Sequence, residues 1–405
     1  MKSILFLGAA DFQVAPIKYA YKSGYKIYTC DNKKENPGHK FANKSFNISS
    51  VDYEAIIEKI KPYKIDAVIS YASDISALSA AKIAEFFDLK SNCSDTISLL
   101  TNKIKFRKFL SEKGIQKQLY FKIKNDHLSE LCSIIKKYKE KMWVLKPCDS
   151  SGSKGVSLIN KGSKLKELKN LIKKTLNHSK SKILIIEEFV EKKGNQVCGD
   201  GYFRKGKIEF IFFGDGWSYH NKPEANFTPY AESFPSSHKS SDLEKLKNHI
   251  ENILIKAGFN EGPFNHDSLI MKDGTPFVIE IGPRNGGNYI PDAIKHLTGF
   301  DFASYTVEQS LGNNINFCHE QPPKDKFVIN LMLHWHKYCK FNNIDFNKNF
   351  EKKILEMNLY VSKGDAVERF RDSQNYFGNI IFTTNTKQDY IHYLNDVKNA
   401  YELKE

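Results

Sequence analysis

The sequence predicts an α/β protein of several domains, in which a parallel N-terminal domain precedes a mixed α+β part. Two patterns predict this arrangement. Strand and helix patterns alternate over the first hundred residues, whereas glycine-containing turn signals separate longer strands in the middle of the chain. The chain has 405 residues. One hydrophobic core rarely serves that length, so we expect roughly two to four domains or subdomains.

The first hundred residues carry the alternating pattern. Short apolar strands are followed by helices, and the last of these helices has closely spaced alanines. In chain order the expected elements are strand 4–9, helix 16–23, strand 25–31, helix 53–60, strand 66–73 and helix 75–87. The turn after the first strand contains Gly8 as its single glycine. A dinucleotide cradle is therefore missing, although Asp31 ends the second strand where a ribose-binding acid would lie.

The pattern of expected elements changes after a helical connector expected at 94–114, because longer strands separated by turns follow it. The turn signals KGNQ (193–196), FRKGK (203–207) and MKDGTP (271–276) predict β-hairpins, and hence an antiparallel sheet with helices packed on it. The C-terminal part alternates strand-like runs at 326–335 and 376–384, and we expect a closing helix from Gln388 to Tyr401.

The charge of the chain suggests a nucleic-acid partner at first sight, because the formal net charge is +14. Only five of the 61 basic residues are arginine, and the other 56 are lysine. Proteins that recognise base edges favour arginine, because its guanidinium group can form two parallel hydrogen bonds, and arginine is scarce here. We therefore interpret the lysines as a solvated surface and expect no nucleic-acid partner. An anionic substrate is compatible with this charge.

The compartment is suggested by the cysteines and by the hydropathy pattern. The seven cysteines are an odd number, lie far apart and form no CxxC motif, which favours reduced thiols over a disulfide framework. No apolar run approaches the roughly 18 residues of a membrane span. The N-terminal apolar stretch is too short for a signal peptide. We expect a cytoplasmic protein without a membrane partner.

The strongest local motif is WVLKPCDSSGSKGVSLI at 143–159. Lys146 directly follows an expected strand. A loop of small residues at 149–155 then precedes another expected strand. Small side chains let backbone N–H groups approach phosphate oxygens, and the lysine adds a fixed cation. The loop lacks GK[ST] before a helix, so it is not a P-loop. Taken alone, it also fits an ordinary glycine/serine hairpin.

Two further motifs follow in the order that a nucleotide site requires. An apolar strand ends in Glu187-Glu188-Phe189-Val190. Asp267 and Glu280 then lie on two strands joined by the turn at 272–274, which places both carboxylates near one end of a sheet. Paired carboxylates on strands suit Mg²⁺ held against ATP phosphates. Arg284 follows shortly after and can stabilise charge on a transferring phosphoryl group.

This order of motifs resembles the ATP-grasp superfamily, and within it the carboxylate–amine ligase branch. The segment 279–302 further resembles members found with surface-polysaccharide genes. The resemblance implies a pre-grasp domain at 1–100, a helical connector at 101–118, a lid at 119–190, a catalytic subdomain at 191–315 and a C-terminal α+β subdomain at 316–405.

The resemblance also implies roles for individual residues. Lys103 and Lys146 match the two lysines that contact ATP phosphates, and Lys146 also counts as catalytic together with Arg284. Asp267 and Glu280 match the metal ligands. The other nucleotide-binding positions are the loop residues Ser150, Ser151, Gly152, Ser153 and Gly155, the adenine hinge Glu187, Glu188, Phe189 and Val190, and the apolar Leu269.

Two positions depart from the family pattern. Gln196 stands where the family often has a ribose-binding glutamate, so we expect an altered ribose contact. Gly282 stands where the family usually has an asparagine that contacts a metal ion. The number of metal ions, one or two, is therefore left open, as is manganese in place of magnesium.

The activity that the resemblance implies is ATP-dependent, ADP-forming ligation of a carboxylate to an amine through an acyl phosphate. The substrates expected first are an amino acid or other carboxylate and an amino sugar or small amine of surface-polysaccharide biosynthesis. The alternatives are a dipeptide-forming or purine-pathway ATP-grasp ligase, or a non-catalytic ATP-binding protein. A homodimer is compatible with the family. We expect substrate recognition by a loop at 217–238, with His220, Glu224, Tyr230 and His238 as candidates beside Asn288 and Tyr289.

Overall fold

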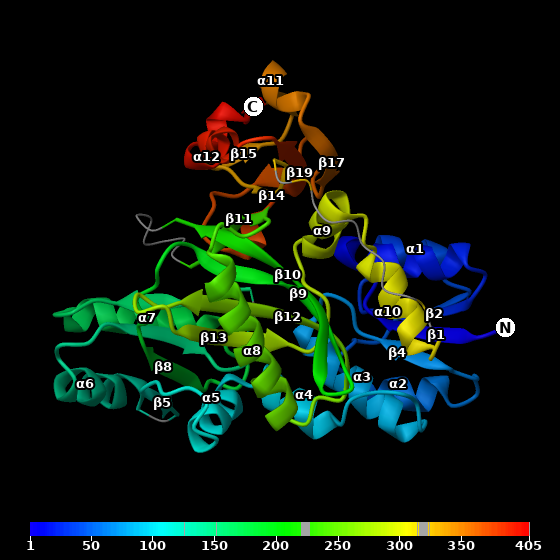
Figure 1. The fold of residues 1–405 in the computed structure, drawn as a ribbon, viewed down its shortest axis with the longest axis horizontal. Helices are drawn as coiled ribbons and strands as arrows, with labels where there is room; N and C mark the ends of the chain where they lie inside the picture. Colours follow the sequence, from blue (N-terminus) through cyan, green and yellow to red (C-terminus); the bar gives the residue numbers. More distant parts are fainter. Residues whose placement is uncertain are drawn as a thin grey trace.

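The computed structural model describes residues 1–124, 126–150, 152–219, 227–313, 315, 323 and 325–404. Its main sheets are two of four strands and one of eight strands. Figure 1 shows the N-terminal domain (blue) and the lid (teal) on opposite sides of the eight-stranded sheet, with the C-terminal elements (orange and red) above them. This mixed architecture confirms the predicted fold class.

The first domain is a parallel sheet in the order β3-β2-β1-β4, with helices packed against it. Three of its strands were predicted, whereas the short β3 was not. Its elements are β1 (Ser3–Leu7), α1 (Val14–Lys22), β2 (Lys26–Cys30), β3 (Lys44–Phe46), α2 (Tyr53–Ile60), β4 (Ala67–Ile69) and α3 (Asp74–Phe86), with 3₁₀ turns at Asp11–Gln13 and Pro37–Phe41.

Helix α2 illustrates why the sequence pattern works well in this domain. Asp52 caps the helix, because its carboxylate accepts a hydrogen bond from the backbone N–H of Ala55. Ile56, Ile57 and Ile60 follow at helical spacing and are buried against the sheet. The helix therefore has the bounds that the periodicity predicts.

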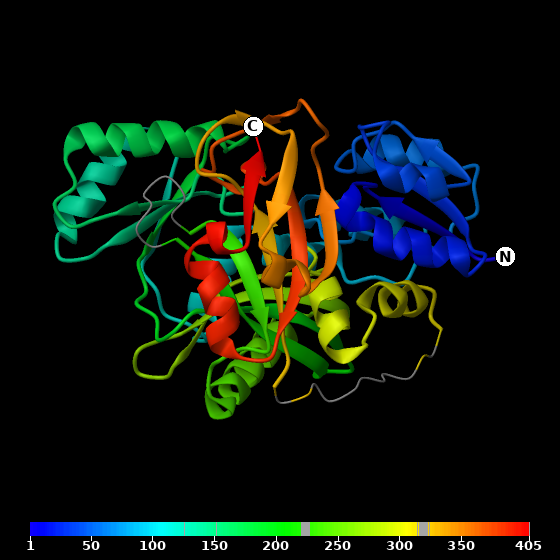
Figure 2. The ribbon, with the colours of Figure 1, turned by 90° about the horizontal axis from the view of Figure 1, so that it is seen from above.

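The lid is an antiparallel sheet in the order β5-β8-β6-β7, joined to the first domain by two connector helices. Figure 2, seen from above, shows the lid helices on the side far from the N-terminus. The elements are α4 (Ser94–Thr101), α5 (Lys103–Glu112), β5 (Tyr120–Ile123), α6 (His127–Lys137), β6 (Trp143–Pro147), β7 (Ser157–Ile159), α7 (Leu165–Asn177) and β8 (Leu184–Glu188).

The eight-stranded sheet is antiparallel and has the order β13-β12-β9-β10-β11-β14-β19-β17. Its strands are β9 (Gln196–Arg204), β10 (Lys207–Ser218), β11 (Pro229–Phe234), β12 (Glu261–Ile270), β13 (Pro276–Gly282), β14 (Phe327–Leu333), β17 (Ile354–Leu359) and β19 (Gly378–Thr384). The accompanying helices are α8 (Ser240–Lys256), α9 (Ile290–Thr298) and α10 (Phe302–Ser310). Helix α10 packs on the first domain through Ala303, Val307 and neighbouring Leu311.

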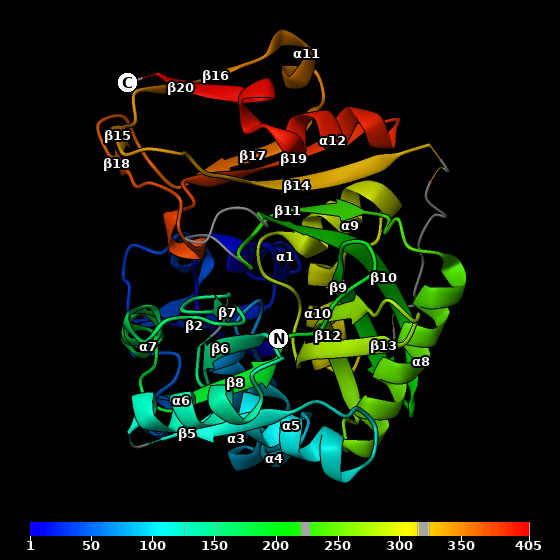
Figure 3. The same cartoon turned by 90° about the vertical axis from the view of Figure 1, so that its left-hand side faces the viewer.

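The C-terminal part shares this sheet with the catalytic subdomain, because β14, β19 and β17 continue it beyond β11. The remaining C-terminal elements are β15 (Cys339–Lys340), β16 (Asn343–Phe346), α11 (Lys348–Glu351), β18 (Ala366–Val367), α12 (Lys387–Asn395) and β20 (Tyr401–Lys404), with 3₁₀ turns at Ser373–Asn375 and Val397–Asn399. Figure 3 shows β16, α11, α12 and β20 above the strands of the sheet.

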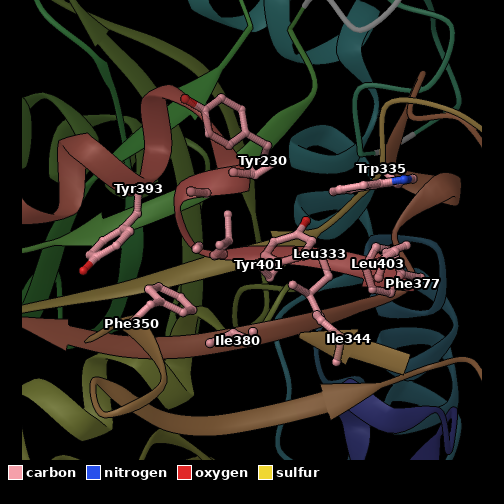
Figure 4. Close-up of a cluster of buried hydrophobic side chains, with 14 of the residues drawn as sticks. Tyr230, Leu333, Trp335, Ile344, Phe350, Phe377, Ile380, Tyr393, Tyr401 and Leu403 are labelled. Atoms are coloured by element: carbon pink, nitrogen blue, oxygen red, sulfur yellow. The ribbon is translucent and has the colours of Figure 1, made fainter. Parts of the chain in front are cut away.

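The structure corrects two sequence-based expectations about where elements begin and end. The closing helix ends at Asn395, and Tyr401 instead begins strand β20, which pairs with β16. The Tyr401 ring is buried among the side chains of Figure 4, so the chain must extend there to reach the core. The expected loop at 217–238 includes strand at both of its described parts, because β10 runs to Ser218 and β11 occupies Pro229–Phe234.

No helix among the described residues is long and apolar enough to cross a membrane.

Candidate active site

The predicted nucleotide-binding residues meet at one cavity between the lid sheet and the β12–β13 hairpin. Its volume is about 170 Å³. The predicted residues that line it are Lys103, Lys146, Ser150, Gly152, Ser153, Glu187, Glu188, Phe189, Val190, Gln196, Asp267, Leu269 and Glu280. Gly155 and Arg284 are not among its lining residues, and Ser151 lies outside the described residues.

A buried ion-pair cluster forms the inner wall of this cavity. The carboxylate of Glu187 lies 2.6 Å from Lys146 Nζ and 2.9 Å from Arg107 Nε. Burial alone would raise the pKa of Glu187, but the charges of Arg107 and Lys146 outweigh it and lower this pKa to about 2. Lys146 is therefore held in place by a carboxylate that stays ionised. Arg107 also donates to the carbonyl of Ile279, 2.7 Å away, and so joins α5 to β13.

The small-residue loop after β6 is held in place at its start. Asp149 accepts hydrogen bonds from Ser179 Oγ (3.0 Å) and from the backbone N–H of Ser181 (2.7 Å). Lys103 Nζ donates to the carbonyl of Ser150 at 2.6 Å, which brings the first predicted phosphate lysine against the loop. Gly152 has a φ of +66°, a conformation that glycine adopts at little cost. These contacts fix the small-residue loop beside two lysines.

The two predicted metal ligands are directly opposite each other, since Asp267 on β12 pairs in register with Glu280 on β13. Burial first, and then the charge of Glu280, raises the pKa of Asp267 to about 7. Gln196 Nε2 donates to Asp267 Oδ1 at 2.7 Å, and Lys103 Nζ lies 3.6 Å from Glu280 Oε2. Gln196, predicted to face the ribose, thus contacts a metal ligand.

This carboxylate pair fits a hard divalent cation such as Mg²⁺. Two neighbouring carboxylates repel each other when both are ionised, and a bound cation would relieve that repulsion. No group of three or more His, Cys, Asp or Glu side chains able to hold a metal occurs in the described part of the chain. A two-carboxylate site suits Mg²⁺, which usually takes its remaining oxygens from nucleotide phosphates and water.

The end of the cavity where adenine is predicted combines an apolar floor with the predicted hinge. Leu269 and its register partner Phe277 line it together with Val144 and Ile279. Two hinge groups already bond within the protein. The N–H of Phe189 donates to the carbonyl of Met142 at 2.9 Å. The carbonyl of Glu188 accepts from Gln118 Nε2 at 2.9 Å.

Arg284 lies apart from this cavity. Its Nη2 contacts Asp74 Oδ2 at 2.5 Å, and Nη1 donates to the carbonyl of Asn285 at 2.9 Å. The guanidinium is buried, with 9% of the residue exposed. Asp74 is the first residue of α3, so the ion pair joins the first domain to the segment after β13. The predicted role of Arg284 at the phosphates stays a prediction.

The structure separates the candidate substrate residues. Tyr230 is buried in the core of Figure 4, where its ring stacks on Tyr219 at 4.3 Å, and this corrects its assignment to a substrate loop. His238 Nε2 hydrogen-bonds the carbonyl of Asn195 and supports the turn before β9. His220 and Glu224 lie outside the described residues.

Asn288 and Tyr289 show a different kind of feature, because they have consecutive positive φ angles of 52° and 60°. Such backbone conformations are costly for non-glycine residues and are often found at functional sites. The side chain of Asn330 donates both to the carbonyl of Asn288 and, at 2.8 Å, to Glu232. Burial raises the pKa of Glu232 to about 8.

Sequence reasoning missed several residues around the site. Arg107 could have been found, because it is a rare arginine four positions after Lys103 and shares its helix face. Gln118, Val144, Phe277 and Ile279 line the cavity but look like ordinary connector or strand residues in the sequence. Glu232 carries no sequence signal, since its burial depends on the assembled sheet.

The comparison with protein families agrees with this geometry. Residues 140–292 match the model of the ATP-grasp domain, a span that holds the small-residue loop, the hinge and the carboxylate pair. This part of the chain is an ATP-grasp domain. The match confirms the ATP-grasp domain that the motifs predict.

Curated relatives are distant in sequence. Dapdiamide A synthase of Enterobacter agglomerans is 24% identical over 252 residues, which are 61% of this chain and 57% of that protein. The formate-dependent phosphoribosylglycinamide formyltransferase of Ignicoccus hospitalis is 22% identical over 69% of this chain and 68% of that protein. The chain thus spans a little over half of the first relative and about two thirds of the second.

Solved structures share the whole fold. An L-amino acid ligase from Bacillus licheniformis has a TM-score of 0.81 at 16% identity, with 100% of this chain and 98% of that one covered. A phosphoribosylglycinamide synthetase from Anaerococcus prevotii has a TM-score of 0.75 at 19% identity, with 100% and 99% covered. At these identities the likeness establishes the ATP-grasp fold over the full chain.

Proposed function

We propose that this protein is an ATP-dependent, ADP-forming ligase that joins a carboxylate to an amine. The observation that carries the proposal is the convergence of Lys103, Lys146 and the Asp267–Glu280 pair on one cavity. Lysines beside a small-residue loop suit the polyphosphate, and the apolar floor around Leu269 suits the base. The named relatives include ligases that form C–N bonds.

The proposed reaction has two steps. An oxygen of the substrate carboxylate attacks the γ-phosphorus of ATP, and ADP leaves, which gives an acyl phosphate. The amine nitrogen then attacks the acyl carbon, inorganic phosphate leaves, and the nitrogen gives up a proton. Phosphorylation is needed because a free carboxylate is a poor electrophile.

The protein's contribution is mainly charge and position. Lys146, fixed by Glu187, and Lys103, against the small-residue loop, offset phosphate charge from two sides. Asp267 and Glu280 would hold magnesium, which when bound neutralises phosphate charge. The loop at 149–155 would exclude water, to which an acyl phosphate is vulnerable.

The relatives favour the substrates of a dipeptide-forming or purine-pathway ligase over those of surface-polysaccharide biosynthesis. Their names point to amino-acid ligation and to purine precursors, and they lend no support to a polysaccharide association. We propose an amino acid or a similar small carboxylate as the acid, because the structure with a TM-score of 0.81 is an L-amino acid ligase. A cytoplasmic location, a homodimer and the lack of a nucleic-acid partner stay predictions.

The test is ADP release with Mg·ATP, hydroxylamine and a panel of amino acids and other small carboxylates. Hydroxylamine traps an acyl phosphate as a hydroxamate, so one acid should give both ADP and hydroxamate. The variant Glu280→Gln should lose this turnover. Asp273→Asn is the matched control, because Asp273 lies in the turn of the same hairpin, where it accepts from the N–H of Thr275. ATP binding without turnover on any acid, with the expected amines also supplied, would favour a non-catalytic protein.

A further inference from the structure

The contact between Arg284 and Asp74 is the only one this guanidinium makes with a carboxylate at hydrogen-bond distance among the described residues. Asp200 also lies near Arg284, but its oxygens already accept from the N–H of Gly286 (2.7 Å) and from Asn265 Nδ2 (2.9 Å). Asp74 is therefore the group that decides where the Arg284 side chain lies. It reaches Arg284 from the other side of the domain boundary.

Gly282 is what makes this contact possible. A Cβ atom at this position would lie 2.8 Å from Arg284 Cζ and 2.8 Å from Asp74 Oδ1. Real Cβ contacts are longer, so any larger residue would push the two side chains from their present positions. The absence of a side chain at 282, a departure from the family pattern, is thus coupled to the ion pair.

We propose that Asp74 is a positioning residue for Arg284, and that Gly282 is required for this pairing. The inference deepens the proposed function and rests on it for its kinetic consequences. The first domain then fixes the position of Arg284, because α3 carries Asp74 to the end of β13, and the kinetic consequences rest also on the predicted role of Arg284 at the phosphates. The asparagine that the family usually has at 282 would not fit beside this pair.

The position of Arg284 can be measured without any activity. The chain has only five arginines, so ¹⁵N-labelled arginine gives five Nε–H signals, and Arg284→Lys assigns the one that disappears. Asp74→Asn and Gly282→Ala should each shift the Arg284 signal and leave the other four in place. A Gly282→Ala protein can fold, because the two crowded atoms are ends of flexible side chains.

Two matched controls belong to this experiment. Gly287→Ala adds a Cβ in the same segment that would meet only the carbonyl of Ala72, at 4.0 Å. Lys90→Gln removes another ion pair between the linker after the first domain and the central sheet, that of Lys90 with Glu261 (2.9 Å). Both should leave the Arg284 signal unchanged. An Arg284 signal that is unmoved in both Asp74→Asn and Gly282→Ala would overturn the proposal.

The kinetic arm uses the acid found with hydroxylamine. Asp74→Asn and Gly282→Ala should each lower kcat by about tenfold or more, while KM for ATP changes by less than about twofold. The double variant should be no worse than either single one, because both act through Arg284. Asp74→Glu, which keeps the charge, should recover part of the lost kcat.

The two arms separate the failure of this inference from that of the proposed function. Multiplying losses in the double variant, or an equal loss in Lys90→Gln, would reduce Asp74 to a structural role and overturn the inference. A wild-type protein that turns over no acid would instead contradict the proposed ligase. The arginine signals would in that case still decide whether Asp74 and Gly282 position Arg284.

Discussion

Asp267 and Glu280 face each other across the β12–β13 ladder, and burial together with the charge of Glu280 raises the pKa of Asp267 to about 7. In the folded protein Asp267 therefore holds its proton at pH values where an ordinary aspartate has lost it. A cation that binds between the two carboxylates must displace that proton.

The raised pKa of Asp267 predicts that the affinity for Mg²⁺ depends on pH. At pH 6 protons compete with magnesium for Asp267, whereas at pH 8 the carboxylate is ionised and repelled by Glu280, so the cation gains affinity. We expect the affinity for Mg²⁺ in the presence of ADP to be about tenfold higher at pH 8 than at pH 6, about 1.4 kcal/mol. Calorimetry measures it. Asp267→Asn should abolish the difference and Asp273→Asn should keep it; a wild-type affinity independent of pH would contradict the pairing.

The Glu187 cluster leads to a prediction about stability. Glu187→Gln leaves Arg107 and Lys146 buried without their carboxylate, which should lower the free energy of unfolding by about 3 kcal/mol at pH 7. The depressed pKa of Glu187 means that this contribution is present above pH 4.5 and is lost as the pH falls towards about 2. Urea unfolding of the wild type and of Glu187→Gln, at pH 7 and at pH 4, measures this difference in the free energy of unfolding.

The control for this variant lies on α5, the helix that carries Arg107. Lys108 and Glu112 form an exposed ion pair on α5, and Lys108→Gln should change the free energy of unfolding by less than about 0.5 kcal/mol. If Glu187→Gln proved no more damaging than Lys108→Gln, the cluster would not stabilise this wall of the cavity.

Lys146 should matter for nucleotide binding as well as for packing. Lys146→Met keeps the length of the side chain but removes the charge that faces the small-residue loop. We expect the Kd for ADP to rise by about tenfold or more. Lys161→Met, at an exposed lysine in the turn after β7, is the control and should leave the Kd unchanged. Equal affinities for all three proteins would remove Lys146 from the nucleotide site.

Glu232 gives a pH effect of the opposite sign to that of Glu187. Burial raises its pKa from 4.5 to about 8, so the folded state holds a proton that the unfolded state releases between these values. The free energy of unfolding should therefore fall as the pH rises from 5 to 8, by at most about 1.4 kcal/mol per pH unit from this group. Glu232→Gln should make the dependence shallower; parallel curves for the two proteins would refute the buried proton.

Much of the fold could be predicted because local patterns agree with the final packing. Helix α2 is capped and amphipathic, so its bounds follow from the sequence alone. Strand β3 is three residues long and mostly exposed, which leaves no periodic signal. The closing helix was predicted to run too far because Tyr401 lies in a strand, β20. That strand pairs with β16, which lies more than fifty positions earlier in the chain.

In the site, too, local spacing predicts some contacts, whereas others depend on how distant segments pack together. Spacing within one hairpin was enough to place Asp267 opposite Glu280, since the turn fixes the register. The role of Glu187 as partner of Lys146 and Arg107 could not be predicted, because it depends on how α5 packs on the lid sheet. The pairing of Arg284 with Asp74 depends on the contact between two domains and leaves no mark in local sequence.

The most direct test of the proposed ligase follows the carboxylate oxygen. The acid identified with hydroxylamine is labelled with ¹⁸O in its carboxylate and incubated with the protein, Mg·ATP and hydroxylamine, and the released phosphate is observed by ³¹P NMR. The proposed acyl phosphate predicts one ¹⁸O atom in each phosphate molecule, because the carboxylate oxygen stays on phosphorus when the acyl carbon is attacked. Phosphate released without ¹⁸O would show that water, and not the carboxylate, receives the phosphoryl group, and would contradict the ligase.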